Sequence, residues 1–279
     1  MKKTVLIALL GLVVLSTACK SEFEKIRSSG DVNQIYSKAQ QYYDNEEYQK
    51  AQTLFEIVIS SYRGKQEAED IYFKYAYTYY HLQQYILASY YFGNFSNTYA
   101  TSDYRQEADF MAAYSNYQLS PTYRLDQSYT KKAIEQLQLF VNTYPNSDKV
   151  QQCNNLIDAM RIKLELKAFK AAELYFDLRE YQAAIRSFEN VLTEFPDSKN
   201  VEEIRYMIIR SAYLLAENSF REKQFERYSD AADRAQEFLA RYEESRYRDD
   251  VQKMLDKSRE ELNNLEDVRY QNESSGVRS

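Results

Sequence analysis

The chain has 279 residues, of which 44% are hydrophobic and 28% are charged, and it contains only five glycines and three prolines. So few helix-breaking residues favour an all-α protein. The formal charge is −6 and the sequence has no basic patch, which argues against nucleic-acid binding. Tyrosine is abundant, with 28 residues beside 14 phenylalanines and no tryptophan.

The N-terminus has the pattern of a secretion signal. Lys2 and Lys3 precede an apolar run over 5–15 and three small residues, and Cys19 comes next. The run is too short to span a membrane as a mature helix. We therefore predict a lipoprotein signal peptide over 1–18, with Cys19 lipidated. Removal of Lys2 and Lys3 with this peptide changes the formal charge from −6 to −8.

Two details of this region bear on anchoring and location. Ser16 stands where leucine is usual in lipoprotein signals, so an ordinary secretory signal followed by a free cysteine is the alternative. Lys20 follows the cysteine, where an aspartate often holds lipoproteins in the inner membrane, so the resemblance to lipoprotein signals favours the outer membrane. Several acyl chains, such as palmitate, would anchor Cys19 stably. We predict a polar tether over 19–31, and a capping box at Asp31 and Gln34 that starts the first helix.

One pattern recurs at a fixed distance in the first hundred residues. Self-similarity at a single period indicates stacked supersecondary units. Within each copy the small and aromatic residues lie three, four and seven positions apart, which is the helical period. They match the tetratricopeptide pattern, in which small residues allow close helix packing and an aromatic residue fills the space between repeats. The residues Ala39, Tyr43, Ala51 and Phe55 recur 37 positions later as Ala76, Tyr80, Ala88 and Phe92.

The sequence thus predicts an all-α tetratricopeptide-repeat solenoid of about five helix pairs with a C-terminal capping helix. The third repeat has an insertion within 119–130, the fourth begins with a long helix, and the fifth has a charged turn over 219–227. The tail over 267–279 is polar and aperiodic, and we expect it to be disordered. The predicted repeats span 32–66, 69–103, 105–147, 149–199 and 201–245, and the cap spans 246–266, so that the solenoid covers 32–266.

The residues that an enzyme would need are not found in the sequence. It has one histidine, His81, and no phosphate-binding, dinucleotide-binding, serine-hydrolase or zinc-protease motif. Cys153 has no disulfide partner if Cys19 is lipidated, and we expect it to be a small buried residue. We predict no catalytic activity, no cofactor and no metal site.

The first helices of the repeats carry aromatic residues at equivalent positions. In tetratricopeptide solenoids these helices line the concave surface, so the sequence predicts an aromatic ladder suited to an extended peptide with aromatic side chains. Packing between adjacent first helices is the alternative, and partial burial would allow both. The ladder is predicted at Tyr36, Tyr43, Phe73, Tyr77, Tyr80, Phe110, Tyr114 and Tyr117, with Phe169 and Phe176 at the equivalent positions of the fourth repeat.

These features together resemble the BamD family, tetratricopeptide lipoproteins of the outer-membrane β-barrel assembly machinery, and most closely the form found in Bacteroidetes-like bacteria. The resemblance covers nearly the whole mature chain. It rests on the Cys19 anchor, five repeats with a cap, and the third-repeat insertion. The motif residues are the repeat ends Tyr144-Pro145-Asn146-Ser147 and Phe195-Pro196-Asp197-Ser198, and the insertion residues Ser120-Pro121 and Asp126-Gln127-x-x-Thr130 leading to Ala133.

The resemblance implies a periplasmic scaffold anchored in the outer membrane. Its C-terminal repeats would bind the POTRA domains of a BamA-like barrel subunit. Its N-terminal repeats would recognise the aromatic-rich C-terminal signals of unfolded outer-membrane proteins, and other lipoproteins of the machinery would be further partners. In the fifth repeat we expect a polar docking surface at the basic residues Arg221, Lys223, Arg227 and Arg234.

Two other kinds of periplasmic adaptor are alternatives. Coordinators of envelope constriction have similar repeat ends, but they usually carry an N-terminal coiled coil and no lipid anchor. Glycan-binding lipoproteins of the SusD type combine an anchor with helical repeats. They are much longer and use a tryptophan-rich sugar surface, whereas this chain has no tryptophan.

Overall fold

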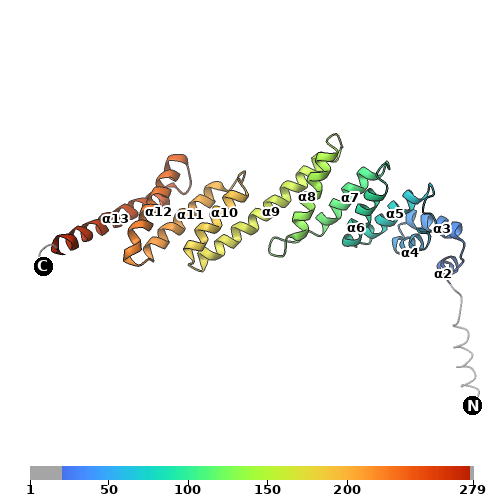
Figure 1. The fold of residues 1–279 in the computed structure, drawn as a ribbon, viewed down its shortest axis with the longest axis horizontal. Coiled ribbons are helices and arrows are strands. Elements are labelled where there is room, and N and C mark those ends of the chain that lie inside the picture. Colours follow the sequence, from blue (N-terminus) through green and yellow to red (C-terminus); the bar gives the residue numbers. More distant parts are fainter. Residues whose placement is uncertain (1–20, 277–279) are drawn as a thin grey trace, which may run out of the picture. The chain divides into compact units, whose positions relative to one another are not determined.

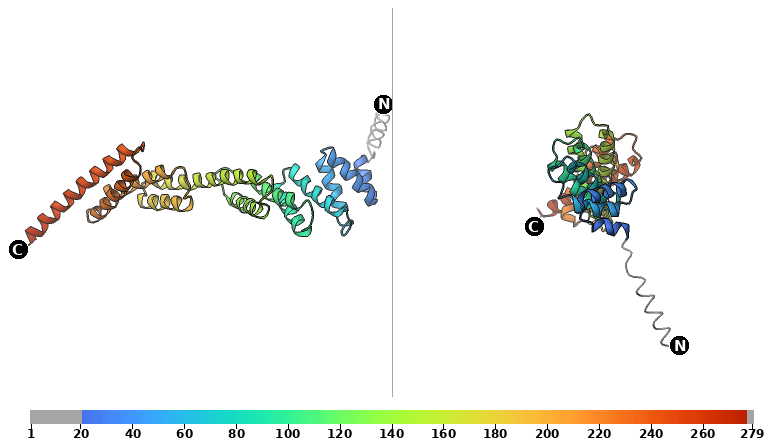
Figure 2. Two further views of the ribbon diagram at one scale, coloured as in Figure 1. Left: turned by 90° about the horizontal axis from the view of Figure 1, so that it is seen from above. Right: turned by 90° about the vertical axis from the view of Figure 1, so that its right-hand side faces the viewer.

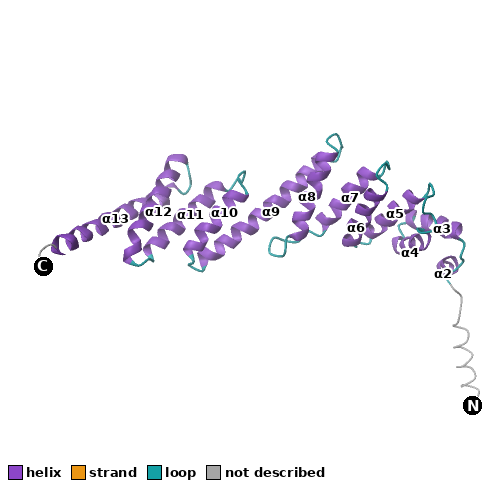
Figure 3. Ribbon diagram, viewed as in Figure 1, coloured by secondary structure: helices purple, strands orange, loops and turns teal. Residues whose placement is uncertain are grey.

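The computed structural model describes residues 21–276, with side chains as far as residue 267. The predicted signal peptide and Cys19 therefore lie outside the described residues. Within the described range the chain forms twelve α-helices joined by loops and no strand (Figures 1 and 3). The predicted fold class is confirmed. No helix in this range is long and apolar enough to cross a membrane.

The chain divides into two compact bodies. Among the described residues, the N-terminal body consists of 21–121 and 126–158, and the C-terminal body of 122–125 and 159–276. The long helix α9 (Val150–Asp177) contributes residues to both.

Three helix pairs of the N-terminal body correspond to the first three predicted repeats, although α5 begins at Ala68, one residue before the predicted second repeat. At the helix crossings, alanines and a large aromatic ring are fully buried together. In the first repeat these are the alanines Ala39 and Ala51 and the ring of Phe55. Such small residues let the antiparallel helices approach while the ring fills the space that remains. The pairs are α3 (Val32–Asp44) with α4 (Tyr48–Val58), α5 (Ala68–His81) with α6 (Tyr85–Thr98), and α7 (Arg105–Gln118) with α8 (Ser128–Thr143).

The C-terminal body continues the same pattern. It contains the rest of α9, then α10 (Tyr181–Glu194), α11 (Val201–Glu217), α12 (Arg221–Arg241) and α13 (Arg248–Gly276). One buried cluster joins α9, α10 and α11 around Ala184, Phe188 and Ile204. A second joins α11, α12 and α13 around Phe238, Val251 and Leu255. Both bury apolar side chains that recur at helical spacing.

Three of the turns inside the repeats have the same unusual backbone. Glu46, Gln83 and Arg179 have positive φ angles of 61°, 58° and 62°. These residues follow the end of a first helix at equivalent repeat positions. In the first turn, the N–H groups of Glu46 and Glu47 donate to the carbonyls of Tyr43 and Tyr42. This pattern is a Schellman cap, for which glycine is the usual residue.

A serine closes three of the repeats. Ser198 Oγ accepts a hydrogen bond from the N–H of Asn200 and donates to Glu165 Oε1 on α9 at 2.6 Å. Ser245 Oγ makes the equivalent pair of bonds, accepting from the N–H of Tyr247 and donating to Glu202 of α11. Ser147 Oγ occupies the same position but accepts both bonds, from the N–H of Lys149 and from Nε2 of Gln106 on α7. The serine therefore fixes the start of the next repeat against the first helix of its own repeat.

The structure differs from the predicted segment boundaries at three places. The expected tether contains a short helix, α2 (Glu22–Arg27), because Ile26 is buried and Phe23 packs edge-on against Tyr42 at 5.9 Å. The fifth-repeat turn is shorter than expected, since α12 already begins at Arg221.

The capping helix is also longer than predicted. α13 continues to Gly276, ten residues past Glu266, and Figure 2 shows its C-terminal part projecting beyond α12. No proline occurs in this extension, and Gly276 is its first glycine. Residues 267–276 thus belong to α13, and residues 277–279 lie outside the described range.

At the start of α3, only one of the two hydrogen-bonding interactions of the predicted capping box is present. Asp31 Oδ1 accepts hydrogen bonds from the N–H groups of Asn33 and Gln34, as an N-cap side chain does. The N–H of Asp31 donates to Ser29 Oγ and thus already has a partner. A serine two residues upstream therefore takes the place that Gln34 would have in a full capping box.

Candidate binding surfaces on the first helices

Helices α3, α5 and α7 bring the predicted ladder residues of the N-terminal body together. Seven of the eight predicted groove residues are partly exposed, and Phe110 alone is buried, with 4% of its surface accessible. Rings contact one another along and between these helices. Phe110 lies 5.4 Å from Tyr114, Tyr114 lies 5.5 Å from Tyr117, and Tyr80 lies 6.2 Å from Tyr114.

Two ladder tyrosines are hydrogen-bonded to the next repeat. Tyr36 of α3 donates to Asp70 Oδ2 of α5 at 3.3 Å, and Tyr77 of α5 donates to Glu107 Oε1 of α7 at 2.7 Å. Burial and the neighbouring Asp70 carboxylate raise the pKa of Tyr36 to about 12. Burial and Glu107 raise the pKa of Tyr77 in the same way. Both hydroxyls therefore stay protonated and link adjacent repeats.

The rings of Phe73 and Phe110 are engaged in packing. Phe73 stacks on Tyr104 at 4.6 Å and also contacts Phe92 and Phe95. Phe110 packs against Phe140 at 5.7 Å, and the ammonium group of Lys149 lies over its ring at 4.7 Å. The prediction that Phe110 contacts a ligand at the surface is wrong, because its neighbours cover it.

The single histidine lies at the last position of α5. Its ring stacks on Tyr48 at 4.0 Å and also contacts Tyr43 and Tyr77. Burial lowers the pKa of His81, so the neutral imidazole is favoured. Among the described residues, no group of three or more histidine, cysteine or acidic side chains could hold a metal ion. Cys153 is a free, fully buried thiol, as expected.

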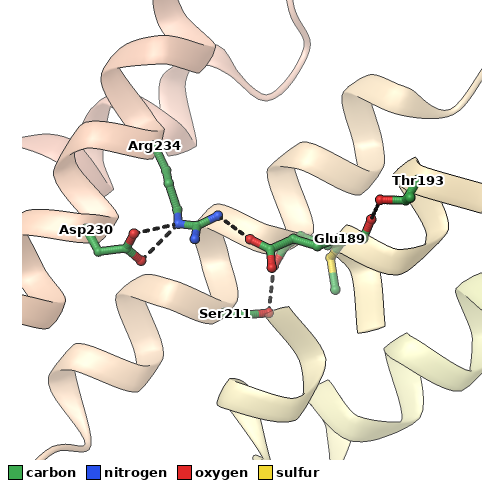
Figure 4. A network of polar contacts seen from close by, with 6 residues as sticks. Glu189, Thr193, Ser211, Asp230 and Arg234 are labelled. Atoms are coloured by element: carbon green, nitrogen blue, oxygen red, sulfur yellow. Dashed lines mark hydrogen bonds and ion pairs between the residues drawn. The ribbon is translucent and has the colours of Figure 1, made fainter. Parts of the chain in front are cut away.

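The four basic residues predicted for docking differ in their surroundings. Arg221 and Lys223 are exposed at the start of α12. Arg227 donates a hydrogen bond to Ser219. Arg234 of α12 lies between two carboxylates, with Nη1 donating to Glu189 Oε1 of α10 at 2.8 Å and Nε donating to Asp230 at 2.9 Å (Figure 4). Arg234 therefore bridges two helices within the C-terminal body.

The sequence analysis missed two residues of the ladder pattern. Tyr206 and Tyr213 lie 37 positions beyond Phe169 and Phe176, at the same two positions of the first helix. Both are partly exposed on α11 and line a groove between α11 and α13 with a volume of about 510 Å³. The 37-residue period contained this signal, although the rest of the fifth repeat is degenerate.

The insertion motif of the third repeat is a hydrogen-bonded structural element. The hydroxyls of Ser120 and Thr130 lie 2.6 Å apart, and Thr130 Oγ1 also donates to Gln127 Oε1 at 2.7 Å. Thr130 and Gln127 are buried. Further along, the ammonium group of Lys167 on α9 donates to the carbonyls of Tyr123 and Leu125. These bonds give the inserted residues a defined conformation.

Comparison with known families decides the affiliation of this repeat protein. The family model of the outer membrane lipoprotein YfiO matches residues 28–203 and 192–268. The chain belongs to the YfiO family of outer membrane lipoproteins. The match begins within the predicted tether and ends in α13, so it includes all five helix pairs. A search of curated proteins finds no match.

Solved structures similar to this YfiO-family chain include proteins described as having tetratricopeptide or tetratricopeptide-like repeats. The MamA protein is 16% identical, with 77% of this chain and 98% of MamA covered and a TM-score of 0.31. A tetratricopeptide protein of Thermus thermophilus is also 16% identical, with 76% and 96% covered and a TM-score of 0.31. Kinesin light chain repeats of Podospora anserina are 13% identical, with 77% and 97% covered and a TM-score of 0.32. Such low scores support no conclusion about function.

Proposed function

We propose that this YfiO-family protein is an outer-membrane-anchored scaffold of the β-barrel assembly machinery that faces the periplasm. Cys19 carries the lipid in this proposal. The C-terminal repeats bind the POTRA domains of a BamA-like barrel subunit, with Arg221 and Lys223 as exposed docking residues. The N-terminal repeats bind the C-terminal signals of unfolded outer-membrane proteins. Family membership supports the location, and the resemblance to the BamD family supports the partners.

The observation that carries the substrate-binding part is the set of partly exposed tyrosines on α3, α5 and α7. Tyr43, Tyr80, Tyr114 and Tyr117 retain accessible ring surface although they contact other rings. A rigid tyrosine presents a large contact area at a low entropic cost, and edge or face contacts with another aromatic ring add about 0.5–1.5 kcal/mol. A peptide with aromatic side chains is the ligand that such a surface favours.

The primary test is a pull-down of the C-terminally tagged protein from outer membranes in mild detergent. The proposal requires a near-stoichiometric barrel protein with periplasmic POTRA domains among the partners. Glycan-uptake proteins or envelope-constriction proteins in its place would favour one of the alternative adaptor functions. The predicted absence of enzymatic activity is tested by incubating the purified protein with envelope substrates.

A second test examines the ladder by itself. Tyr117 contacts only Tyr114 among the aromatic contacts of the described residues, so Tyr117→Ala removes ladder surface with little loss of packing. We expect weaker binding of peptides that end in an aromatic residue, and an unchanged helical circular dichroism spectrum. Tyr90→Ala on α6 is the matched control, because Tyr90 is 59% exposed and lies outside the ladder. Equal binding by both variants would mean that the ladder serves packing only.

A further inference from the structure

The groove between α11 and α13 is a surface of a different kind from the ladder of the N-terminal body. There, residues of the next repeat contact the ladder rings and leave them only partly exposed. Tyr104, just before α7, stacks on Phe73, and Tyr114 of α7 contacts Tyr80. Next to α11, the capping helix α13 takes the place of a further first helix. It leaves a groove of about 510 Å³ between itself and α11. This volume is within the usual range of ligand sites, about 300–1,000 Å³.

Apolar surface from both helices lines this groove. Tyr206, Tyr213 and Leu214 come from α11, and Met254 comes from α13. Tyr206 is held in place by stacking on Tyr247 at 4.2 Å and by a hydrogen bond of 3.2 Å to Asp250 Oδ2. Its ring is therefore fixed before any ligand arrives. Methionine adapts to different side chains and is common at binding surfaces.

The charges around the groove favour a ligand with carboxylate groups. The lining includes three cations, Arg210, Lys253 and Lys257, and two anions, Asp250 and Asp256, in a chain whose formal charge is −6. Asp250 already accepts from Tyr206 and pairs with Lys253 at 3.7 Å, and Asp256 accepts from Gln252. Lys257 and Arg210 are exposed, and the Arg210 guanidinium is held over the Phe176 ring at 4.8 Å.

We propose that the α11–α13 groove binds a segment of a partner protein in which an aromatic or long aliphatic side chain lies next to an aspartate or glutamate. The apolar side chain lies between Tyr213, Leu214 and Met254, and the carboxylate lies by Lys257 and Arg210. This site is separate from the ladder of α3, α5 and α7 and from the basic residues at the start of α12. It does not depend on the identity of the partner as a barrel subunit.

The experiment measures binding of the full mature protein to an array of short synthetic peptides. Each peptide has a central phenylalanine, leucine or serine, and flanks of glutamate, glutamine or lysine. We expect the peptides with phenylalanine or leucine between glutamates to bind best. Equal binding with glutamate and lysine flanks would overturn the proposal, and so would no binding above background.

Two variants assign the binding to this groove. Lys257→Glu should weaken binding of the glutamate-flanked peptides about threefold to fivefold, as expected for one exposed ion pair, and should shift the preference towards lysine flanks. Lys199→Glu, also an exposed lysine of the C-terminal body but not in the groove, is the control. If both variants change binding equally, the proposed site is wrong.

Tyr213 tests the apolar part. Tyr213→Ala should weaken binding at least tenfold, as loss of a central aromatic contact does, whereas Tyr213→Phe keeps the ring and should bind like the natural protein. If Tyr213→Phe loses as much binding as Tyr213→Ala, the ring is not the contact.

Sedimentation at several protein concentrations is the last experiment. A dimer that Lys257→Glu dissociates would assign the groove to a second copy of the chain and overturn the proposal.

Failure of this array and failure of the proposed function give different results. The pull-down identifies the partners of the whole protein and does not depend on the groove. A barrel subunit in the pull-down with no peptide binding would remove the groove and leave the scaffold function. Peptide binding without a barrel subunit in the pull-down would support the groove and contradict the scaffold function.

Discussion

The hydroxyl of Tyr77 on α5 donates a 2.7 Å hydrogen bond to Glu107 Oε1 on α7, the first helix of the next repeat. Glu107 also pairs with Lys149 at 3.3 Å, so a tyrosine, a carboxylate and an ammonium group lie in one line of contacts. Each repeat buries only part of its own surface, and a bond of this kind stabilises the contact between neighbours.

Loss of this hydroxyl should therefore destabilise the stack. We expect Tyr77→Phe to lower the free energy of unfolding by about 1–2 kcal/mol, because a hydrogen bond to a charged group is lost while the ring remains. Urea unfolding followed by circular dichroism gives the value. Tyr90→Phe on the exposed part of α6 is the control and should change stability by less than about 0.5 kcal/mol. Equal effects of the two variants would show that the bond to Glu107 contributes nothing.

Two partly buried tyrosines, Tyr36 and Tyr144, predict a loss of stability in alkaline solution. Burial, with help from Asp70 for one and Asp109 for the other, raises the pKa of Tyr36 and of Tyr144 to about 12, whereas an unfolded tyrosine has a pKa of about 10. Between these values the folded state binds more protons than the unfolded state. The contribution of these tyrosines is therefore complete below about pH 10 and is lost as the pH rises towards 12.

Urea midpoints measured from about pH 8 to about pH 11.5 test this sign, with tyrosinate absorbance recorded in parallel. We expect the midpoint to fall above about pH 10. A variant that combines Tyr36→Phe and Tyr144→Phe should show a smaller fall. A midpoint that is constant or rises over this range contradicts the pKa assignments.

The left-handed turn residue Arg179 is a site for stabilisation. Its φ of 62° is costly for a residue with a Cβ atom, by about 1–2 kcal/mol, whereas glycine adopts it freely. Glycine also loses more backbone entropy on folding, so we expect Arg179→Gly to stabilise the protein by about 0.5–1 kcal/mol net. Asn190→Gly, an exposed position inside α10, should instead destabilise by about 1 kcal/mol. Calorimetry distinguishes the two, and a lower melting temperature for Arg179→Gly would refute the argument.

Arg234 and the pair Arg221 with Lys223 should have different effects when they are replaced. Arg234→Ala leaves Glu189 and Asp230 without their shared cation, and we expect a loss of about 1–2 kcal/mol of stability. Arg221→Ala with Lys223→Ala removes exposed charges and should leave stability within about 0.5 kcal/mol. If these two residues dock the partner, the double variant loses it from the pull-down while its unfolding curve is unchanged. A partner that stays bound would contradict their docking role.

Replacement of the predicted lipidated cysteine tests the anchor. We expect Cys19→Ala to move the protein from the membrane fraction to the soluble envelope fraction, because the acyl chains supply the membrane affinity. Cys153→Ala is the control, because that thiol is fully buried, and this variant should stay with the membrane. A membrane-bound Cys19→Ala protein would refute the lipoprotein assignment.

The period of 37 residues was enough to predict the fold, because the positions of small and aromatic residues determine where helices can cross. Ala39, Ala76 and Ala88 are all fully buried, as this pattern predicts. The helix boundaries were less well defined. The start of α12 at Arg221 and the continuation of α13 to Gly276 lie in charged sequence, where hydrophobic periodicity gives no signal. Ile26 buries itself against neighbours that the local sequence does not specify.

The sequence by itself determined that this chain is a stack of helix pairs, because the repeated spacing of small and aromatic residues is a local property that every repeat satisfies. It also provided the aromatic positions of the first helices. Only the tertiary structure decided which rings stay accessible. Phe110 is covered by Phe140 and Lys149, whereas Tyr213 borders a groove because α13 carries few apolar side chains opposite it. Burial depends on the side chains that the next helix presents, and these are distant in the sequence.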